Sequence, residues 1–375
     1  MALKKCIGCC ICGIVASLAL STCSSQLTSD RSDGFSASEA MFVSTGLHNS
    51  IDVYPLDADG DVRPGATIKG VATGLDDAKS IAVDSSGKIY VLNNEGGAGY
   101  TGTIEVFAPG SRGNIAPIVR IAGADTGLRS VNDIAVDSSG QIYVAIEGNG
   151  VGDASPNISP AILIYPSGSN GNVRPSMTIG GPDTRIQNPY GVAVDAKGNL
   201  FVAEAFTLDM GRILVFPAGS KGNVKPSVVV EGPNTGLYAP TAVALDRDDN
   251  LCVANAKGRD RRNLSNGSSI TIFKLDRDGR PASAPSPDGP APAAKISGPK
   301  TGLTNDSYTS IPGIAVDSRK NIYVTLQGGR YNEINKVIVF AAGSNGDVAP
   351  SAIISGNNSR LPHPVGFAIG PYDGR

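Results

Sequence analysis

One phrase recurs along this chain of 375 residues: an apolar run ending in Asp, a tight turn, and a second run rich in β-branched and aromatic residues. Its clearest copies are residues 81–91 (IAVDSSGKIYV), 134–144 (IAVDSSGQIYV) and 192–202 (VAVDAKGNLFV). Two further copies, residues 243–253 and 314–324, replace the turn glycine. Self-similarity at a regular spacing is the signature of repeat architectures, so this feature constrains the fold most strongly.

A sixth copy is divided between the two ends of the chain. Residues 367–370 supply its first run shortly before Arg375, and residues 41–43 supply a second run near the other end. Each unit has four short strand signals separated by turn residues, and four such strands form one antiparallel sheet. Six sheets arranged around an axis make a β-propeller, whereas a β-sandwich or a stack of hairpins would not explain six similar units. The sequence predicts an all-β, six-bladed propeller over residues 41–375, closed by pairing of its N- and C-terminal strands.

The beginning of the chain differs from the rest. Lys4 and Lys5 precede an apolar stretch over residues 7–20, and small residues follow up to Cys23, a pattern that predicts an export signal. Leu20-Ser-Thr-Cys23 resembles the lipobox of bacterial lipoproteins, although Thr stands where that pattern has Gly, Ala or Ser. The resemblance implies cleavage before Cys23 and its acylation. An ordinary secretory signal and an uncleaved anchor are the alternatives.

These features predict the organisation and location of the chain. We expect residues 1–23 to be a signal peptide and the Ser-rich residues 24–40 to be a flexible tether. The protein is then exported to the bacterial cell envelope and held at a membrane by a lipid on Cys23. The formal net charge of −2 gives no electrostatic footprint for nucleic acid. We expect a monomer, with Cys252 as a buried apolar residue because it stands where other copies have Tyr or Phe.

Glycine and Asn or Asp also recur in the loops between the third and fourth strand signals. Residues 109–114, PGSRGN, have counterparts at 166–172, 217–223 and 342–347, which favours hairpin turns. Two related segments, residues 57–61 (DADGD) and 276–279 (DRDG), resemble fragments of a calcium loop. Neither continues to the Glu that such a loop needs, so turns are the better interpretation.

The recurring Gly-Ile-Ala-Val-Asp-like phrase makes residues 41–370 similar to the NHL-repeat family of β-propellers. That resemblance implies scaffolds that bind protein or RNA, together with a few enzymes, and it places the loops after the second strand and before the first strand on one face of the ring. Loops that vary in this way usually carry function. The variable face predicted here comprises residues 45–49, 93–102, 147–159, 204–211, 255–268 and 327–335.

Related six-bladed propellers include lactonases and lyases with a metal in the central funnel, so residues at loop starts near the axis are candidates for a site. Acid and amide groups converging there would suit a hard cation such as calcium. Glu147 and Glu204 are the candidate metal ligands, because both follow the second strand of neighbouring blades. His48 and His363 are too few for a histidine-ligated lyase, and we interpret them as solvated loop residues. The candidate funnel residues are Asn93, Asn94, Asn132, Asp133, Glu147, Glu204, Asn255 and Gln327.

Two functions remain open from the sequence. The favoured one is a non-enzymatic, membrane-tethered scaffold whose loop face binds a protein, peptide or glycan. The alternative is a hydrolase, lactonase-like, or a lyase with a divalent cation in the funnel. The lining of the funnel discriminates between them, since four or more acid and amide groups aimed at one point favour the enzyme, and an apolar lining favours the scaffold.

Overall fold

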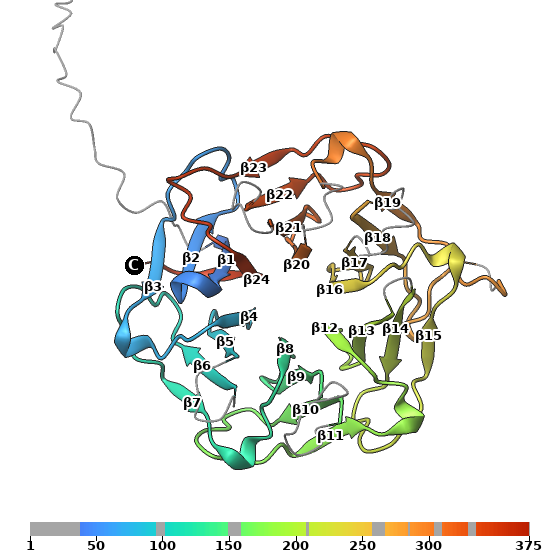
Figure 1. Cartoon of the computed structure of the whole chain (residues 1–375), viewed down its shortest axis with the longest axis horizontal. Helices are drawn as coiled ribbons and strands as arrows, with labels where there is room; N and C mark the ends of the chain where they lie inside the picture. Colours follow the sequence, from blue (N-terminus) through green and yellow to red (C-terminus); the bar gives the residue numbers. More distant parts are fainter. Residues whose placement is uncertain are drawn as a thin grey trace, which may run out of the picture. The chain divides into compact units, whose positions relative to one another are not determined.

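A computed structural model describes residues 38–94, 102–148, 159–207, 210–256, 267–283, 286–303, 310–328 and 335–374. Six four-stranded antiparallel sheets surround a central axis, with one strand of each sheet next to the axis (Figure 1). The predicted six-bladed β-propeller is therefore confirmed. In the part of the chain that is described, no helix is long and apolar enough to cross a membrane.

Each blade runs from an inner strand beside the axis to an outer strand at the rim. From inner to outer, blade 1 contains β24 (Pro364–Tyr372), β1 (Ser38–Thr45), β2 (Ser50–Pro55) and β3 (Ala66–Lys69), and blade 2 contains β4 (Ala78–Val83), β5 (Ile89–Asn93), β6 (Thr103–Phe107) and β7 (Val119–Ile121). Blade 3 contains β8 (Val131–Val136), β9 (Ile142–Ile146), β10 (Ala161–Tyr165) and β11 (Met177–Gly180), and blade 4 contains β12 (Pro189–Val194), β13 (Leu200–Thr207), β14 (Met210–Phe216) and β15 (Val228–Val230). Blade 5 contains β16 (Pro240–Leu245), β17 (Leu251–Asn255), β18 (Ser269–Phe273) and β19 (Ala294–Ile296), and blade 6 contains β20 (Ser310–Val316), β21 (Ile322–Gln327), β22 (Lys336–Phe340) and β23 (Ala352–Ile354).

Short 3-10 helices accompany these strands. One, η1 (Gly46–His48), joins β1 to β2, and the others follow outer strands and lead to the next blade. They are η2 (Val71–Thr73), η3 (Ala124–Thr126), η4 (Pro182–Thr184), η5 (Pro233–Thr235) and η6 (Pro299–Thr301).

Blade 1 closes the ring by joining the two ends of the chain. Strand β24 pairs antiparallel with β1, with Phe42 opposite Ala368 and Ser38 opposite Tyr372. The predicted closure is therefore confirmed. Strand β1 begins at Ser38, three residues before the predicted start of the propeller at Met41, because β24 extends to Tyr372 and supplies backbone partners for those residues.

The core lies between the blades. Apolar side chains from facing sheets form separate clusters, such as the one that joins Leu92 and Ile104 of blade 2 to Ile134 and Val144 of blade 3. Cys252 belongs to the cluster between blades 5 and 6 and is 2% exposed. Burial raises the pKa of the Cys252 thiol to about 12. The expectation that Cys252 is a buried apolar residue is confirmed.

The Asp that ends each apolar run holds the turn to the second strand. Asp84 Oδ1 accepts hydrogen bonds from the backbone N–H groups of Ser86 (2.9 Å) and Lys88 (3.0 Å). Asp137 and Asp195 accept the equivalent bonds in the next two blades. The repeated Asp is therefore a turn residue, as the sequence indicates.

The Asn or Asp of the loop between the third and fourth strands reaches beyond its own hairpin. Asn172 Oδ1 accepts a hydrogen bond of 2.8 Å from the N–H of Asp125, in the 3-10 helix that follows the preceding blade. Gly123 precedes that helix with a φ of 128°, and a Cβ there would lie 2.4 Å from Asn172 Oδ1. These residues therefore join neighbouring blades and also form turns. The sequence of one unit does not reveal the first role, because the partner lies in another unit. We call the joints the outer belt; its capping residues are Asp61, Asn114, Asn172, Asn223 and Asp347.

The two calcium-like segments belong to these turns and joints. Asp61 Oδ1 accepts hydrogen bonds from the N–H groups of Asn358 (2.7 Å) and Ser359 (3.1 Å). Asp276 Oδ1 accepts them from the N–H groups of Asp278 (2.8 Å) and Arg280 (2.9 Å). The carboxylates therefore cap backbone groups, which agrees with the interpretation of both segments as turns.

Candidate functional site

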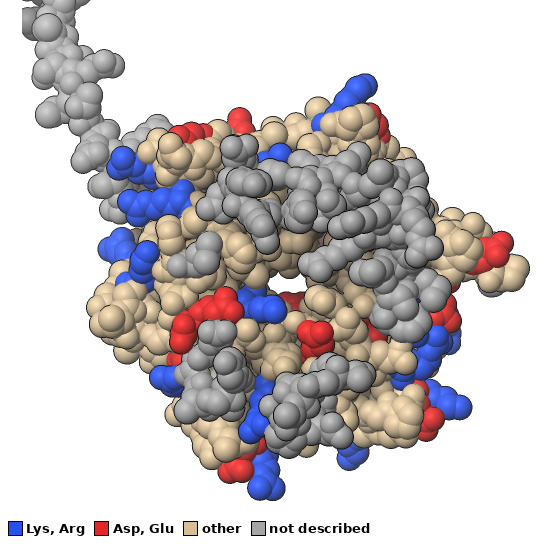
Figure 2. All heavy atoms as spheres, viewed as in Figure 1, with Lys and Arg blue, Asp and Glu red and all other residues tan. Residues whose placement is uncertain are grey.

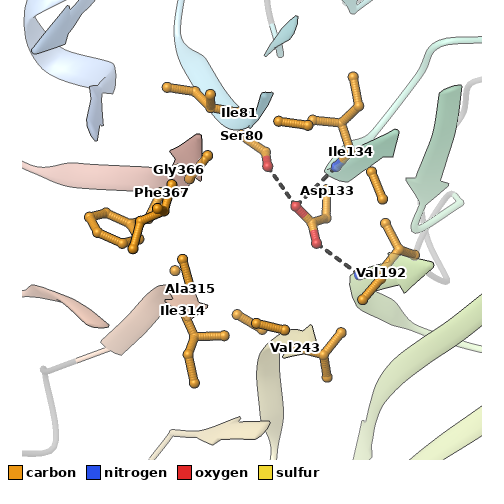
Figure 3. Close-up of a pocket in the computed structure, with 18 of the residues that line it drawn as sticks. Ser80, Ile81, Asp133, Ile134, Val192, Val243, Ile314, Ala315, Gly366 and Phe367 are labelled. Carbon is orange, nitrogen blue, oxygen red and sulfur yellow. Dashed lines mark hydrogen bonds between the residues drawn. The ribbon is translucent and has the colours of Figure 1, made fainter. Parts of the chain in front are cut away.

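The inner strands enclose a channel of about 230 Å³ along the axis (Figure 3). This is somewhat smaller than the roughly 300 Å³ at which pockets for small ligands usually begin. Its wall consists mainly of Val, Ile, Leu, Ala and Phe from the six inner strands. Among the described residues that line it, Ser80 and Asp133 have the only polar side chains, and Asp133 has the only ionisable one.

One equivalent position of the inner strands brings neighbouring blades unusually close where it is occupied by glycine. A Cβ on Gly366 would lie 2.6 Å from the Cα of Ser80, and a Cβ on Gly191 would lie 3.0 Å from the Cα of Ala242. Such approaches leave no room for a side chain at those glycines. We call this position in the six inner strands the inner ring; its members are Gly366, Ser80, Asp133, Gly191, Ala242 and Gly313.

Asp133 is the exception in the inner ring, and its carboxylate links three blades. Oδ1 accepts hydrogen bonds from Ser80 Oγ (2.5 Å, blade 2) and from the N–H of Ile134 (2.9 Å), and Oδ2 accepts one from the N–H of Val192 (2.8 Å, blade 4), as Figure 3 shows. Burial raises the pKa of Asp133 to about 6, and the three hydrogen bonds oppose that rise. Asp133 thus reaches the channel as predicted, with its carboxylate already engaged by the protein.

The neighbouring candidate, Asn132, has a different environment. It is 8% exposed, and its Nδ2 donates a hydrogen bond of 2.9 Å to the carbonyl of Pro189 in blade 4. Asn132 lies where the register shifts between Val131 and Asp133, and it is not among the residues that line the channel. Asn132 is a contact between blades 3 and 4.

Asn93, Glu204 and Asn255 occupy one equivalent position near the end of the second strand. All three side chains are nearly inaccessible to solvent, at 0%, 0% and 1% exposure. Each accepts a hydrogen bond from the backbone just before its own inner strand, such as the 3.3 Å bond from Asp76 N–H to Asn93 Oδ1. Their common role is to hold that segment in place, and none of the three is among the residues that line the channel.

Glu204 combines this role with a buried charge pair. Its Oε2 accepts hydrogen bonds from the N–H groups of Gln187 (2.9 Å) and Asn188 (3.1 Å) and lies 3.7 Å from a terminal nitrogen of Arg212. Burial raises the pKa of the Glu204 carboxyl, while the two backbone N–H groups and Arg212 oppose the rise. The carboxylate is oriented by blade 4 alone.

Asn94, Glu147 and Gln327 follow one residue later than this buried position. The side chain of Glu147 is exposed, and its backbone N–H donates to the carbonyl of Ser130 (2.9 Å). A shift of one residue along a strand moves a side chain to the other face. Glu147 and Glu204, the two candidate metal ligands, therefore have different environments, one exposed and the other buried. The described residues contain no group of three or more His, Cys, Asp or Glu side chains arranged to hold a metal.

At the closing blade the structure brings together polar residues that the sequence did not pair. The ring Nε2 of His363 lies 2.6 Å from Gln327 Nε2, and Ser310 Oγ donates a hydrogen bond of 3.0 Å to Gln327 Oε1. A Cβ on Gly46 would lie 2.9 Å from Asp77 Oδ1 and 3.8 Å from His363 Nδ1, so these two groups are close to each other.

This cluster changes the interpretation of the two histidines. Burial lowers the pKa of His363, and the nearby Asp77 carboxylate opposes the change. His48 is exposed, as expected, whereas His363 is half-buried and hydrogen-bonded rather than solvated. Asp77 and His363 both immediately precede an inner strand, and this shared place in the repeat is the sequence signal that would have paired them. Asn94 joins the cluster through a 3.2 Å hydrogen bond from its Nδ2 to Asp77 Oδ2.

The mouth of the channel carries charged groups of both signs around a central opening (Figure 2). Much of the predicted variable face lies outside the described residues, as does Cys23. Those parts of the predicted loops are residues 95–101, 149–158, 208–209, 257–266 and 329–334.

No protein-family model and no curated protein matches this chain. Solved structures do match it. A protein of unknown function from Bacteroides caccae is 13% identical with a TM-score of 0.51, and the match covers 89% of this chain and 99% of that chain. A protein from Lactobacillus plantarum is 12% identical with a TM-score of 0.52, covering 85% and 83%. The PQQ-bound aldose sugar dehydrogenase from Streptomyces coelicolor is 14% identical with a TM-score of 0.48, covering 80% and 90%.

At such low identity the first two likenesses show the fold alone, which agrees with the β-propeller described above. Membership of the NHL-repeat family and the lipoprotein signal stay predictions from the sequence.

Proposed function

We propose that this protein is a membrane-tethered scaffold of the bacterial cell envelope that binds a protein, peptide or glycan through its variable loop face. The observation that carries the proposal is the channel wall. It offers one carboxylate, Asp133, and three hydrogen bonds from the protein already engage it. Among the described residues, no other candidate acid or amide group lines the channel. Asn93, Glu204 and Asn255 are buried in the blades, Glu147 is exposed, and Asn94 and Gln327 belong to the cluster with Asp77 and His363. The channel therefore lacks the convergence of four or more such groups that the enzyme would need.

The construction of the ring also suits a platform. Caps such as Asn172 to the N–H of Asp125 tie each rim segment to the next blade, and closely packed inner strands tie the blades at the axis. A rigid framework that carries loops of different length is a common design for binding sites. Binding specificity then resides in the loops, and the framework sets their spacing.

Site-specific photo-crosslinking tests where the partner binds. A crosslinking amino acid replaces Glu147, which is exposed at the end of β9 on the loop face, and in a matched control it replaces Ser85, which is exposed in a turn at the opposite end of blade 2. We expect a discrete crosslinked species in the native envelope from position 147 and none from position 85. Equal labelling from both positions, or none from position 147, contradicts a loop-face partner.

The tether has its own test, motivated by the lipobox-like Leu20-Ser-Thr-Cys23. Stable anchoring needs more than one acyl chain, as a bacterial lipoprotein carries at its Cys. We expect Cys23→Ala to abolish incorporation of labelled fatty acid and to release the protein from the membrane fraction. Unchanged labelling would mean that the anchor lies elsewhere.

Elemental analysis separates the scaffold from the metal-dependent alternative. A metal that binds the folded state stabilises it by mass action, so its removal would lower the unfolding temperature. We expect no stoichiometric divalent metal and no effect of a chelator on thermal unfolding. Stoichiometric metal together with a chelator-induced fall in Tm would favour the hydrolase or lyase and overturn the scaffold proposal.

A further inference from the structure

Three large apolar side chains are exposed in the described part of the chain, and all three belong to the two segments that meet at the rim between blades 1 and 2. Val71 is 98% exposed, Ile118 54% and Ile115 40%. The outer-belt joint brings the two segments together, since Lys69 N–H donates to the carbonyl of Gly113 (3.1 Å) and Ala72 N–H donates to Asn114 Oδ1 (2.8 Å). Apolar residues grouped on a surface indicate an interaction site more strongly than single ones.

The repeat supplies an internal comparison for this group. Ile118 stands where blades 3, 4 and 6 have Ser176, Ser227 and Ser351, and in all four the backbone N–H donates to the third strand. The three serines also donate their hydroxyls to that strand at 3.1 Å, a bond that isoleucine cannot make. Blade 2 therefore lacks a hydrogen bond that three other blades make and has an exposed apolar side chain at that position. The fold itself does not require this apolar side chain.

Basic residues flank the apolar group. Lys69 is exposed at the end of β3, and the exposed Arg112 lies one residue before Gly113. Figure 2 shows Lys and Arg side chains gathered over blade 1, on the flank where β3 lies in Figure 1. We call Lys69, Val71, Arg112, Ile115 and Ile118 the rim patch.

The rim patch lies beside the point where the tether joins the propeller. Arg112 donates a hydrogen bond of 3.2 Å to the carbonyl of Gly374, two residues after Tyr372, which pairs with Ser38 at the start of β1. Residues 24–37 connect Cys23 to Ser38, and a segment of that length spans at most about 50 Å. A lipid on Cys23 would therefore keep this part of the propeller at high effective concentration near a membrane surface.

We propose that the rim patch docks on an anionic lipid surface, with Val71, Ile115 and Ile118 entering the headgroup region and Lys69 and Arg112 contacting phosphate groups. The proposal deepens the proposed function, because it rests on a chain tethered to a membrane. A basic residue near an anionic surface contributes about 1 kcal/mol, and small apolar side chains add to it by burial. The tether lies away from the variable loops, since Ser38 starts the second strand of blade 1 and those loops follow the second strands. The patch extends from the Arg112 side towards the loop face, because Lys69 pairs with Ser50, which directly follows the loop 45–49.

Vesicle binding tests the patch without the anchor. The full chain with Cys23→Ala is mixed with vesicles of phosphatidylcholine, alone or with the anionic phosphatidylglycerol, and bound protein is measured by flotation. We expect binding to the anionic vesicles that weakens as salt rises. We expect Ile115→Ser with Ile118→Ser to weaken binding at least about tenfold, because less apolar surface is then buried in the lipid.

Charge variants show whether vesicle binding depends on the basic residues of the rim patch or on the net charge of the whole protein. Lys69→Gln with Arg112→Gln should weaken binding to anionic vesicles about tenfold, whereas Lys221→Gln with Lys225→Gln, the same loss of charge on blade 4, should change it less than about twofold. Thermal unfolding confirms that every variant is folded. The absence of binding by the Cys23→Ala chain, binding that the isoleucine variant retains, or equal losses in the two charge variants would overturn the proposal. Fatty-acid labelling tests the lipid anchor, and crosslinking tests the loop-face partner. Either of these two proposals can therefore be wrong while the rim patch still binds lipid.

Discussion

At the rim, five of the six joints between blades use one contact, an Asn or Asp side chain that accepts a hydrogen bond from the backbone turn after the preceding blade. The sixth joint uses the carbonyl of Asp288, 2.9 Å from the N–H of Asn234, in the segment between β18 and β19 of blade 5. At the channel the joints differ from blade to blade, and Asp133 alone adds a charge. The rim contact is a hydrogen bond from a backbone N–H, a group that is present in every repeat. The contacts at the inner ring depend on how closely two particular strands approach each other.

The largest expected effect comes from opening the inner ring. Deleting residues 361–375 removes β24, leaves β1 as an exposed edge and separates blade 1 from blades 2 and 6. We expect loss of cooperative unfolding, measured by circular dichroism against temperature. The matched control deletes residues 373–375 only, which leaves β24 in place and should cost little. A long deletion that unfolds at the same temperature as the full chain would show that the belt alone can hold the ring.

Glu204 and Glu147 test whether a difference of one residue in strand position decides how much a side chain contributes to the free energy of unfolding. Glu204→Ala removes the carboxylate beside the buried Arg212 and leaves two backbone N–H groups without their acceptor, so we expect a loss of about 3 kcal/mol in the free energy of unfolding. Glu147→Ala removes an exposed side chain and should change it by less than about 0.5 kcal/mol. Urea unfolding measures both. Similar values for the two variants would contradict the buried position of Glu204.

The buried carboxyl group of Asp133 predicts that the free energy of unfolding depends on pH through the inner ring. Burial raises its pKa from an ordinary 3.8 to about 6, so between these values the folded protein keeps a proton that the unfolded chain has released. Its contribution to stability is fully present below about pH 4 and is lost as the pH rises to about 6. By linkage the loss amounts to about 2 to 3 kcal/mol.

The measurement compares the parent with Asp133→Asn, which has no charge to titrate. Other carboxylates titrate equally in both proteins and cancel in the difference. We expect the free energy of unfolding of the parent to fall relative to the variant between pH 4 and 6, and to run parallel outside that window. Parallel curves throughout would mean that the carboxylate is solvated and that the inner ring has no such titration.

The smallest effect is expected at one joint of the outer belt. Asn172→Ala removes the cap on the N–H of Asp125 and should cost about 1 kcal/mol, the usual loss for such a cap. Asn223→Ala provides the matched change at the next joint, where the N–H of Asp183 loses its partner. The two losses should agree within about 0.5 kcal/mol and should add in the double variant. Unequal losses would show that repeated contacts are not energetically equivalent.

The repeat made most of the fold predictable. The apolar phrase placed the inner and second strands of five blades, and the divided sixth copy placed the closing pair of β1 and β24. The boundary at Ser38 was not predictable, because Glu39 and Ala40 resemble linker residues until β24 supplies backbone partners. Of the candidate site, Asp133 reached the channel as predicted, whereas Asn93, Glu204 and Asn255 turned into the blades.

The sequence by itself determined the number of blades, the closure and the turn chemistry of this protein, because each depends on local patterns that repeat. Tertiary structure alone decided which side chains face the channel, since a strand that shifts by one residue exchanges its faces. It also decided that Asn172 caps the neighbouring blade, that Asp77 lies near His363, and that Ala72 meets Asn114 at the rim. These pairs join residues of different blades, and their distances depend on how the twisted sheets pack around the axis.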